Sequence, residues 1–130
     1  MAIPPTAKPT LFLGVTDRAA AQAFYSDRLG LPFLGEHHGL LMYALQGVTL
    51  YLSVIHTFTP HEFTVLNWEV PDLAAAQAAL KATGVVFTDY REAAFGLEQD
   101  ENLVWTAPDG TRIAWFNDPD GNVLSLSQPA

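Results

Sequence analysis

The sequence predicts an α+β fold made of two similar halves, each with a strand, a helix and then three strands. Three observations predict it: an internal repeat, polar residues that cap two alanine-rich helices, and alternating apolar and polar residues in the segments between them. The chain has 130 residues, of which 49% are hydrophobic, so it is long enough to bury a core. We expect a single domain over residues 1–130.

The internal repeat centres on the two helices. Asp17–Ala23 (DRAAAQA) is similar to Asp72–Ala78 (DLAAAQA), and in both halves a glycine and then a phenylalanine follow. The strand before each helix and the strand that ends each half are similar as well. The repeats therefore cover about residues 9–55 and 62–128, and the second has gained residues between its helix and its last strand.

In the first half, local signals mark where the helix begins and ends. Asp17 is a good N-cap, because its carboxylate can accept hydrogen bonds from the free N–H groups of the first turn. Ala21, Tyr25 and Leu29 share one helical face, and Gly30 ends the helix. Strands are predicted at residues 10–16, 33–37, 40–45 and 48–54.

The second half follows the same order. Asp72 caps a helix over residues 73–83, and Gly84 ends it. Strands are predicted at residues 63–70, 86–88, 103–106, 111–117 and 123–127. This is one more strand than in the first half, so one of them is extra or a loop. Residues 91–102 contain four acidic residues and form either a solvated surface loop or a lid over the site.

Two motifs resemble the vicinal oxygen chelate superfamily. One is Phe116–Asn122 (FNDPDGN), which predicts a tight turn before the last strand, and the other is Phe24–Pro32, with FY at its start and LGLP at its end. That superfamily includes glyoxalase I, extradiol dioxygenases, fosfomycin-modifying enzymes and bleomycin-resistance proteins. The resemblance implies two βαβββ modules in tandem, with curved mixed sheets around a cleft and the helices outside.

The resemblance places a ligand in the cleft, and alternation along each strand indicates which side chains face it. The two tryptophans among the candidates are included for their flat surfaces, since alternation does not decide which way they face. The candidate ligand-binding residues are Thr10, Phe12, Thr49, Tyr51, Ser53, Asn67, Glu69, Trp105, Trp115 and Ser125.

Three of these candidates each have a functional and a non-functional interpretation. Glu69 is the candidate catalytic residue, as a general base or as a counter-ion for a cationic ligand, or else it lies in solvent at the end of its strand. Asn67 orients a ligand amide or carbonyl, or else it bonds to a neighbouring strand. Tyr51 donates to a ligand oxygen, or else it is a core residue whose hydroxyl is satisfied.

The resemblance also implies where a divalent metal would be held. The positions that carry metal ligands in many members fall here on Thr10, Tyr51, Val65 and Ser125. None of these is the histidine or carboxylate that a transition metal requires. We therefore expect no metal and no cofactor.

The histidines offer only an unconventional metal site. His37 and His38 are adjacent, so on a strand they would point to opposite faces. His56 and His61 lie in the connection between the halves, where no helix aligns them. We expect surface or hinge histidines, and the alternative is a displaced site made from Glu69 and one of them.

Composition excludes several classes of partner. The chain has six Lys and Arg against 14 Asp and Glu, a formal net charge of −8, which argues against nucleic acids and anionic membranes. It has no cysteine, which excludes disulfides and thiolate chemistry. Residues 39–55 carry no formal charge, but this run alternates like a strand and is too short to span a membrane. We see no signal peptide and expect a cytoplasmic protein.

Three functions fit these observations. The main hypothesis is a metal-free protein of the glyoxalase/bleomycin-resistance type that binds an aromatic or cationic small molecule in the cleft. The alternative is a lyase-, isomerase- or dioxygenase-like enzyme, with a displaced metal site or with acid–base chemistry at Glu69. The third is a partner or regulatory module whose cleft is vestigial. The resemblance further implies a homodimer, with residues 56–61 as the hinge between modules.

Overall fold

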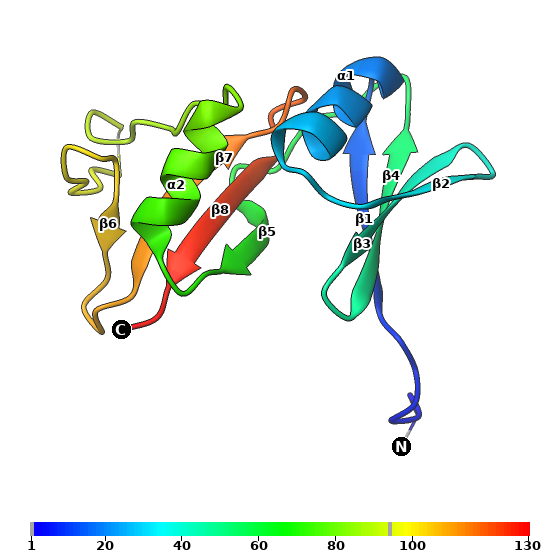
Figure 1. Ribbon diagram of the computed structural model, residues 1–130, viewed down its shortest axis with the longest axis horizontal. Helices are drawn as coiled ribbons and strands as arrows, with labels where there is room; N and C mark the ends of the chain where they lie inside the picture. The colour runs from blue at the N-terminus through cyan, green and yellow to red at the C-terminus, as the bar shows by residue number, and fades with distance from the viewer. Residues whose placement is uncertain (1, 94) are drawn as a thin grey trace. The chain divides into compact units, whose positions relative to one another are not determined.

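The structure is a computed structural model that describes residues 2–93 and 95–130 (Figure 1). The chain divides after Thr59 into two units, and each unit contains a mixed four-stranded sheet. In both units a first strand is followed by a helical segment and three further strands, as the internal repeat predicted. The α+β fold of two βαβββ modules is therefore confirmed, while a single domain over residues 1–130 stays a prediction.

The first unit orders its strands β1-β4-β3-β2, with β1 parallel to β4 and the other neighbours antiparallel. Its strands are β1 (Thr10–Val15), β2 (Phe33–His37), β3 (Leu40–Leu45) and β4 (Val48–Val54). On β4, Leu50 and Leu52 are fully buried, whereas Tyr51 between them is half-buried. One face of the sheet therefore belongs to the core, as alternation predicted.

The helix of the first unit begins and ends at the predicted residues. Asp17 is the N-cap of α1 (Arg18–Gln22), and its carboxylate accepts from the N–H of Ala20 at 3.0 Å. After the helical segment, Gly30 has a φ of 71°, the left-handed conformation that glycine adopts without strain.

Beyond α1 the helix widens, which the spacing did not predict. Residues Ala23–Arg28 form a π-helix, η1, in place of the regular helix expected there. The wider turn lets the adjacent Phe24 and Tyr25 both lie in the core, with 6% and 0% of their surfaces exposed. Next to them, the hydroxyls of Ser26 and Tyr43 are 2.7 Å apart. A pattern based on 3.6 residues per turn cannot detect this local widening.

The second unit orders its strands β5-β8-β7-β6, with β5 parallel to β8 and the other neighbours antiparallel. Its strands are β5 (Thr64–Glu69), β6 (Trp105–Thr106), β7 (Arg112–Asn117) and β8 (Val123–Gln128). The buried side chains of Phe116, Leu124 and Leu126 form the apolar face of this sheet.

The helix of the second unit, α2 (Leu73–Ala82), has the predicted N-cap and the predicted glycine after its end. The carboxylate of Asp72 accepts from the N–H of Ala75 at 3.0 Å, and Gly84 follows the helix with a φ of 100°. Within the described residues, neither α2 nor any other helix is long and apolar enough to cross a membrane.

Of the strands predicted after α2, the one at residues 86–88 is the extra one. Only Phe87 pairs there, in an isolated bridge to Phe116 on β7. The strand predicted at residues 103–106 is shortened to the two residues of β6, which also pair with β7. Both segments pair with β7, and each of them pairs with only part of that strand.

A β-bulge near the start of β5 corrects one predicted position. Thr64 pairs with Val123 and Leu66 with Leu124, so Val65 is an extra residue between two consecutive partners on β8. The bulge places Thr64, and not Val65, in register with the sheet face that carries Asn67. Thr64 therefore takes the register position that strict alternation assigned to Val65, because alternation assumes an unbroken register.

The turn before β8 has the predicted geometry. The Asp118 carboxylate accepts from the backbone N–H groups of Asp120 and Asn122 at 3.0 and 2.9 Å and from the Asn122 side-chain amide at 2.7 Å. Gly121 has a φ of 89°, so it is the left-handed residue that reverses the chain. Asp118 is only 5% exposed, so its bonds are made largely out of contact with solvent.

Candidate small-molecule site

The predicted ligand-binding residues lie in two groups, one in each unit. In each unit they alternate along the strands with the buried apolar residues. The group of the first unit consists of Thr10, Phe12, Thr49, Tyr51 and Ser53. The group of the second unit consists of Asn67, Glu69, Trp105, Trp115 and Ser125. Each group is considered by itself.

In the second unit, one face of the sheet carries a hydrogen-bonded cluster, and we call it the serine face. It is defined by Thr64, Asn67, Trp115, Ser125 and Ser127, which share a face by register. The Ser125 hydroxyl donates to Oδ1 of Asn67 at 2.7 Å, and Nδ2 of Asn67 donates to the Ser127 hydroxyl at 2.9 Å.

The two serine contacts fix the orientation of the Asn67 carboxamide. Ser125 and Ser127 are 2% and 7% exposed, whereas Asn67 itself is exposed. A carboxamide has two N–H donors, and the bond to Ser127 uses one of them. Asn67 therefore does bond to a neighbouring strand, and the same bonds fix the direction of its second N–H.

Trp115 supplies the flat surface beside this cluster. It is the register partner of Ser125, and its indole N–H donates to the Thr64 hydroxyl at 3.1 Å. The Trp105 ring lies 6.3 Å from the Trp115 ring, between centroids, and the Tyr90 ring meets it edge-on at 5.6 Å. The indole is therefore held at its N–H and by two neighbouring rings.

The segment before β6 brings Tyr90 to Trp115 and is held by one buried side chain. Gln99 is 9% exposed, and its amide donates to the carbonyls of Thr88 and Leu103 at 3.2 and 2.9 Å. Its Oε1 accepts from the N–H of Tyr90 at 2.5 Å. The acidic residues of this segment are exposed, as a solvated loop requires, but the Tyr90 ring lies against Trp115 of the serine face. Sequence analysis missed Tyr90 and Gln99, because this segment has no periodicity.

The pKa shifts of Tyr90 and Asp89 indicate a neutral tyrosine next to a carboxylate that stays charged. Burial raises the pKa of the Tyr90 phenol, and a hydrogen bond with Thr88 offsets this in part, so the hydroxyl keeps its proton at neutral pH. Hydrogen bonds from the Arg91 side chain and backbone lower the pKa of Asp89 to about 2. The Asp89–Arg91 pair therefore stays ionised at the start of the loop.

We expect Gln99→Ala to loosen the segment over residues 89–104. The substitution removes the bonds that Gln99 makes to three backbone groups, and leaving such partly buried groups unpaired costs up to about 1–3 kcal/mol. Limited proteolysis should cut this segment faster, and urea denaturation should show the lower stability. Gln46→Ala, at an exposed turn residue, is the control. Equal cleavage of the two variants would contradict the role of Gln99 in holding this segment.

In the first unit, the corresponding face carries a stacked aromatic pair. The rings of Phe12 and Tyr51 lie 4.9 Å apart at 17°, and Phe12 is 58% exposed. The half-buried Tyr51 therefore stacks against an exposed ring. Further along β1, a Cβ on Gly14 would lie 2.6 Å from the Phe58 ring, so glycine lets this ring lie directly on the strand.

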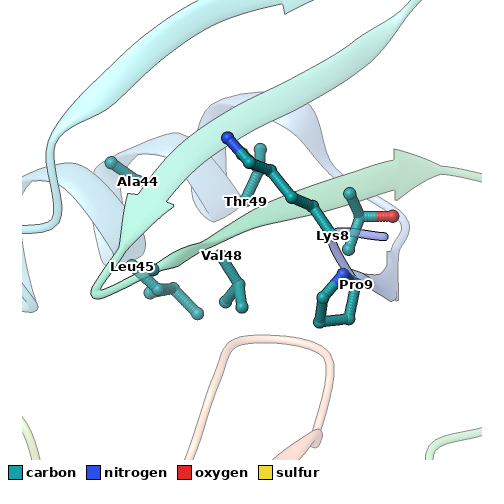
Figure 2. Close-up of a pocket in the computed structure, with 8 residues that line it drawn as sticks. Lys8, Pro9, Ala44, Leu45, Val48 and Thr49 are labelled. Atoms are coloured by element: carbon teal, nitrogen blue, oxygen red, sulfur yellow. The ribbon is translucent and has the colours of Figure 1, made fainter. Parts of the chain in front are cut away.

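A hollow of about 350 Å³ lies at the other end of this face (Figure 2). Thr10 and Thr49, which are register partners on β1 and β4, contribute to it. Its lining consists of Lys8, Pro9, Thr10, Ala44, Leu45, Gly47, Val48 and Thr49. Two predicted site residues therefore meet here, next to a lysine that sequence analysis did not single out. We call this feature the Lys8 hollow.

The positions that the resemblance assigns to metal ligands do not fit a metal. The bulge makes Thr64 the counterpart of Thr10. Thr10 pairs with the residue two before Tyr51 on β4, and Thr64 pairs with the residue two before Ser125 on β8. Thr10, Tyr51, Thr64 and Ser125 offer only neutral hydroxyl groups, whereas transition metals take imidazole, thiolate or carboxylate ligands. Over residues 2–93 and 95–130, no three His, Cys, Asp or Glu side chains gather as a metal site. Glu69 is exposed at the end of β5.

One prediction about the histidines was wrong. The rings of His37 and His38 lie 4.1 Å apart at 68° and do not point to opposite faces. His38 is not on a strand: its φ is 51° and that of Gly39 is 80°, a conformation typical of a tight hairpin turn. His56 and His61 are exposed, which fits surface residues.

Comparison with known proteins identifies the fold. By sequence, no known protein family and no curated protein matches the chain. Solved structures do match. TnmS3, an antibiotic-binding protein from Streptomyces sp. CB03234, is 28% identical with a TM-score of 0.69, and the match covers 100% of this chain and 99% of TnmS3.

Two further structures match over nearly the whole chain. A glyoxalase/bleomycin resistance protein from Catenulispora acidiphila is 21% identical with a TM-score of 0.70, covering 96% of this chain and 100% of that one. A glyoxalase/bleomycin resistance protein/dioxygenase from Nocardioides is 18% identical with a TM-score of 0.71, covering 98% and 85%. The chain therefore has the fold of the glyoxalase/bleomycin resistance/dioxygenase proteins, which is the fold of the vicinal oxygen chelate superfamily.

Proposed function

We propose that this protein binds a small planar aromatic molecule on the serine face of its second unit. One observation carries the proposal: an indole fixed through its N–H to Thr64 shares a sheet face with the exposed Asn67 carboxamide, which two serines orient. Such a face offers a stacking surface and a directed hydrogen-bond donor without charge. The 28% identity to the antibiotic-binding protein TnmS3 over the whole chain supports small-molecule binding.

Binding on this face requires neither a metal nor a cofactor. The polar groups next to Trp115 are amide and hydroxyl groups, which recognise carbonyl and N–H groups of a ligand directly. Glu69 lies at the end of β5, so a positively charged substituent would find a counter-ion at that end of the strand. Neutral and cationic planar molecules are therefore the expected classes, and the formal charge of −8 favours both over anions on this face.

The test is a titration with two planar probes in buffer that contains a metal chelator. Lumichrome is neutral and carries carbonyl and N–H groups, and proflavine is a cation of similar size. Saturable quenching of tryptophan fluorescence with a Kd well below about 1 mM is the expected result for at least one probe. If neither binds, or if binding appears only after a divalent metal is added, the proposal is wrong and the alternative of an enzyme with a displaced metal gains support.

We also propose that the protein is a homodimer. In the first unit β2 is an edge strand, and its Phe33 and Leu34 are 41% and 52% exposed. Exposed apolar residues on a strand with unpaired backbone groups favour association with a second chain. Light scattering at micromolar concentration should give twice the chain mass of 14.2 kDa. A mass of one chain under these conditions would contradict the proposal.

A further inference from the structure

We infer that the Lys8 hollow of the first unit binds the carboxylate of a small aromatic acid. This inference goes beyond the proposed function, since it concerns the first unit, a different ligand charge and none of the residues of the serine face. It is carried by the one cation in the lining of the hollow, by two hydroxyl groups and by the aromatic pair next to it.

The polar groups of the hollow are all able to donate hydrogen bonds. Lys8 supplies an ammonium group, and Thr10 and Thr49 supply hydroxyl groups from directly paired positions on β1 and β4. Figure 2 shows the Lys8 side chain extending toward Thr49. An ammonium group and two hydroxyl groups in the lining of one hollow match a carboxylate, whose oxygens only accept.

Lys8 is one of few cationic residues in this acidic chain. The sequence has only six Lys and Arg, against 14 Asp and Glu. Arg18 is paired with Glu36 and Arg91 with Asp89, and the lining of the hollow contains no acidic residue. An anion repelled by most of this acidic surface would therefore meet a positive group at the Lys8 hollow.

The apolar groups indicate the rest of the ligand. Pro9, Leu45 and Val48 line the hollow, and the stacked Phe12–Tyr51 pair follows Thr10 and Thr49 two residues further along each strand. Positions two apart on a strand lie on the same face, about 7 Å from each other. A carboxylate beside Lys8 can thus belong to a molecule whose ring covers the apolar wall or Phe12. The volume of about 350 Å³ is within the range of small-molecule pockets.

The test compares 1-naphthoate with 1-naphthamide, which have the same ring system but differ in charge. We expect the wild-type protein to bind naphthoate about tenfold more tightly, because only the acid forms the charge-assisted contact. Lys8→Gln should lower the affinity for naphthoate to that for naphthamide and leave naphthamide unchanged. Lys81→Gln is the matched control: Lys81 lies on α2 over the Phe87 ring and outside the hollow, so it should keep the tenfold preference.

The readout is calorimetry together with amide chemical shifts, which should change at Thr10 and Thr49. Equal affinity of the two probes, absence of binding by both, or a preference that survives Lys8→Gln would each overturn the inference. Loss of the preference in Trp115→Ala instead would place the acid on the serine face. In that case the inference fails while the proposed function stands, so the two failures are distinguishable.

Discussion

Trp115→Ala should lower the affinity for the planar probe that binds the serine face by about tenfold or more. Stacking on an aromatic side chain contributes about 1–3 kcal/mol, and about 1.4 kcal/mol corresponds to a factor of ten. The loss should be this large because the indole is already held by Thr64 and two neighbouring rings, so little ordering is needed when the ligand binds. Calorimetric titration of the purified variant measures it.

Two further variants separate stacking from loss of structure. Trp115→Phe keeps a ring but loses the indole N–H that bonds to Thr64, so we expect a smaller loss of affinity. Trp68→Phe changes a tryptophan that does not share the serine face and should leave binding unchanged. A loss as large in Trp68→Phe as in Trp115→Ala would show that binding depends on the general stability of the unit and not on this face.

Asp118→Ala should lower the free energy of unfolding of the second unit by about 2–4 kcal/mol. The carboxylate is 5% exposed and accepts from two backbone N–H groups and from the Asn122 side chain. Hydrogen bonds to a charged group are worth about 1.5–3 kcal/mol each, and their loss leaves buried donors unpaired. The three tryptophans, Trp68, Trp105 and Trp115, all lie in this unit, so their fluorescence in urea reports its unfolding.

The matched control for this prediction is Asp109→Ala. Asp109 also accepts from a backbone N–H within a turn, that of Thr111, but it is exposed to solvent. Water replaces that bond when it is lost, so the change in stability should be clearly smaller than for Asp118→Ala. Equal losses in the two variants would contradict the role assigned to the buried carboxylate.

Much of the fold could be predicted because its signals are local. The strands at residues 33–37, 40–45 and 48–54 have the predicted bounds, since alternation and the turns between them are properties of neighbouring residues. The caps at Asp17 and Asp72 are local in the same sense. The bulge at Val65 and the π-helix over Ala23–Arg28 could not be predicted, because strict periods of two and of 3.6 residues give no signal for one extra residue.

The site residues likewise divide into those that could be predicted from local patterns and those that could not. Alternation placed Thr49, Tyr51 and Ser53 on one face of β4, because only the strand period is needed for that. Gln99 and Tyr90 could not be found, because their contacts join loop residues to distant backbone and ring atoms. The positive φ angle of His38 can likewise not be predicted from the alternation of apolar and polar residues.

The central claim is that a small molecule binds on the serine face without a metal. It is tested most directly by recording amide and indole spectra of the isotope-labelled protein during titration with lumichrome and with proflavine, with a metal chelator present throughout. The account predicts progressive shifts of the Trp115 indole N–H, the Asn67 side-chain amide and the β8 backbone with at least one probe. Unchanged signals from these groups throughout both titrations, or shifts that require added metal, would contradict it.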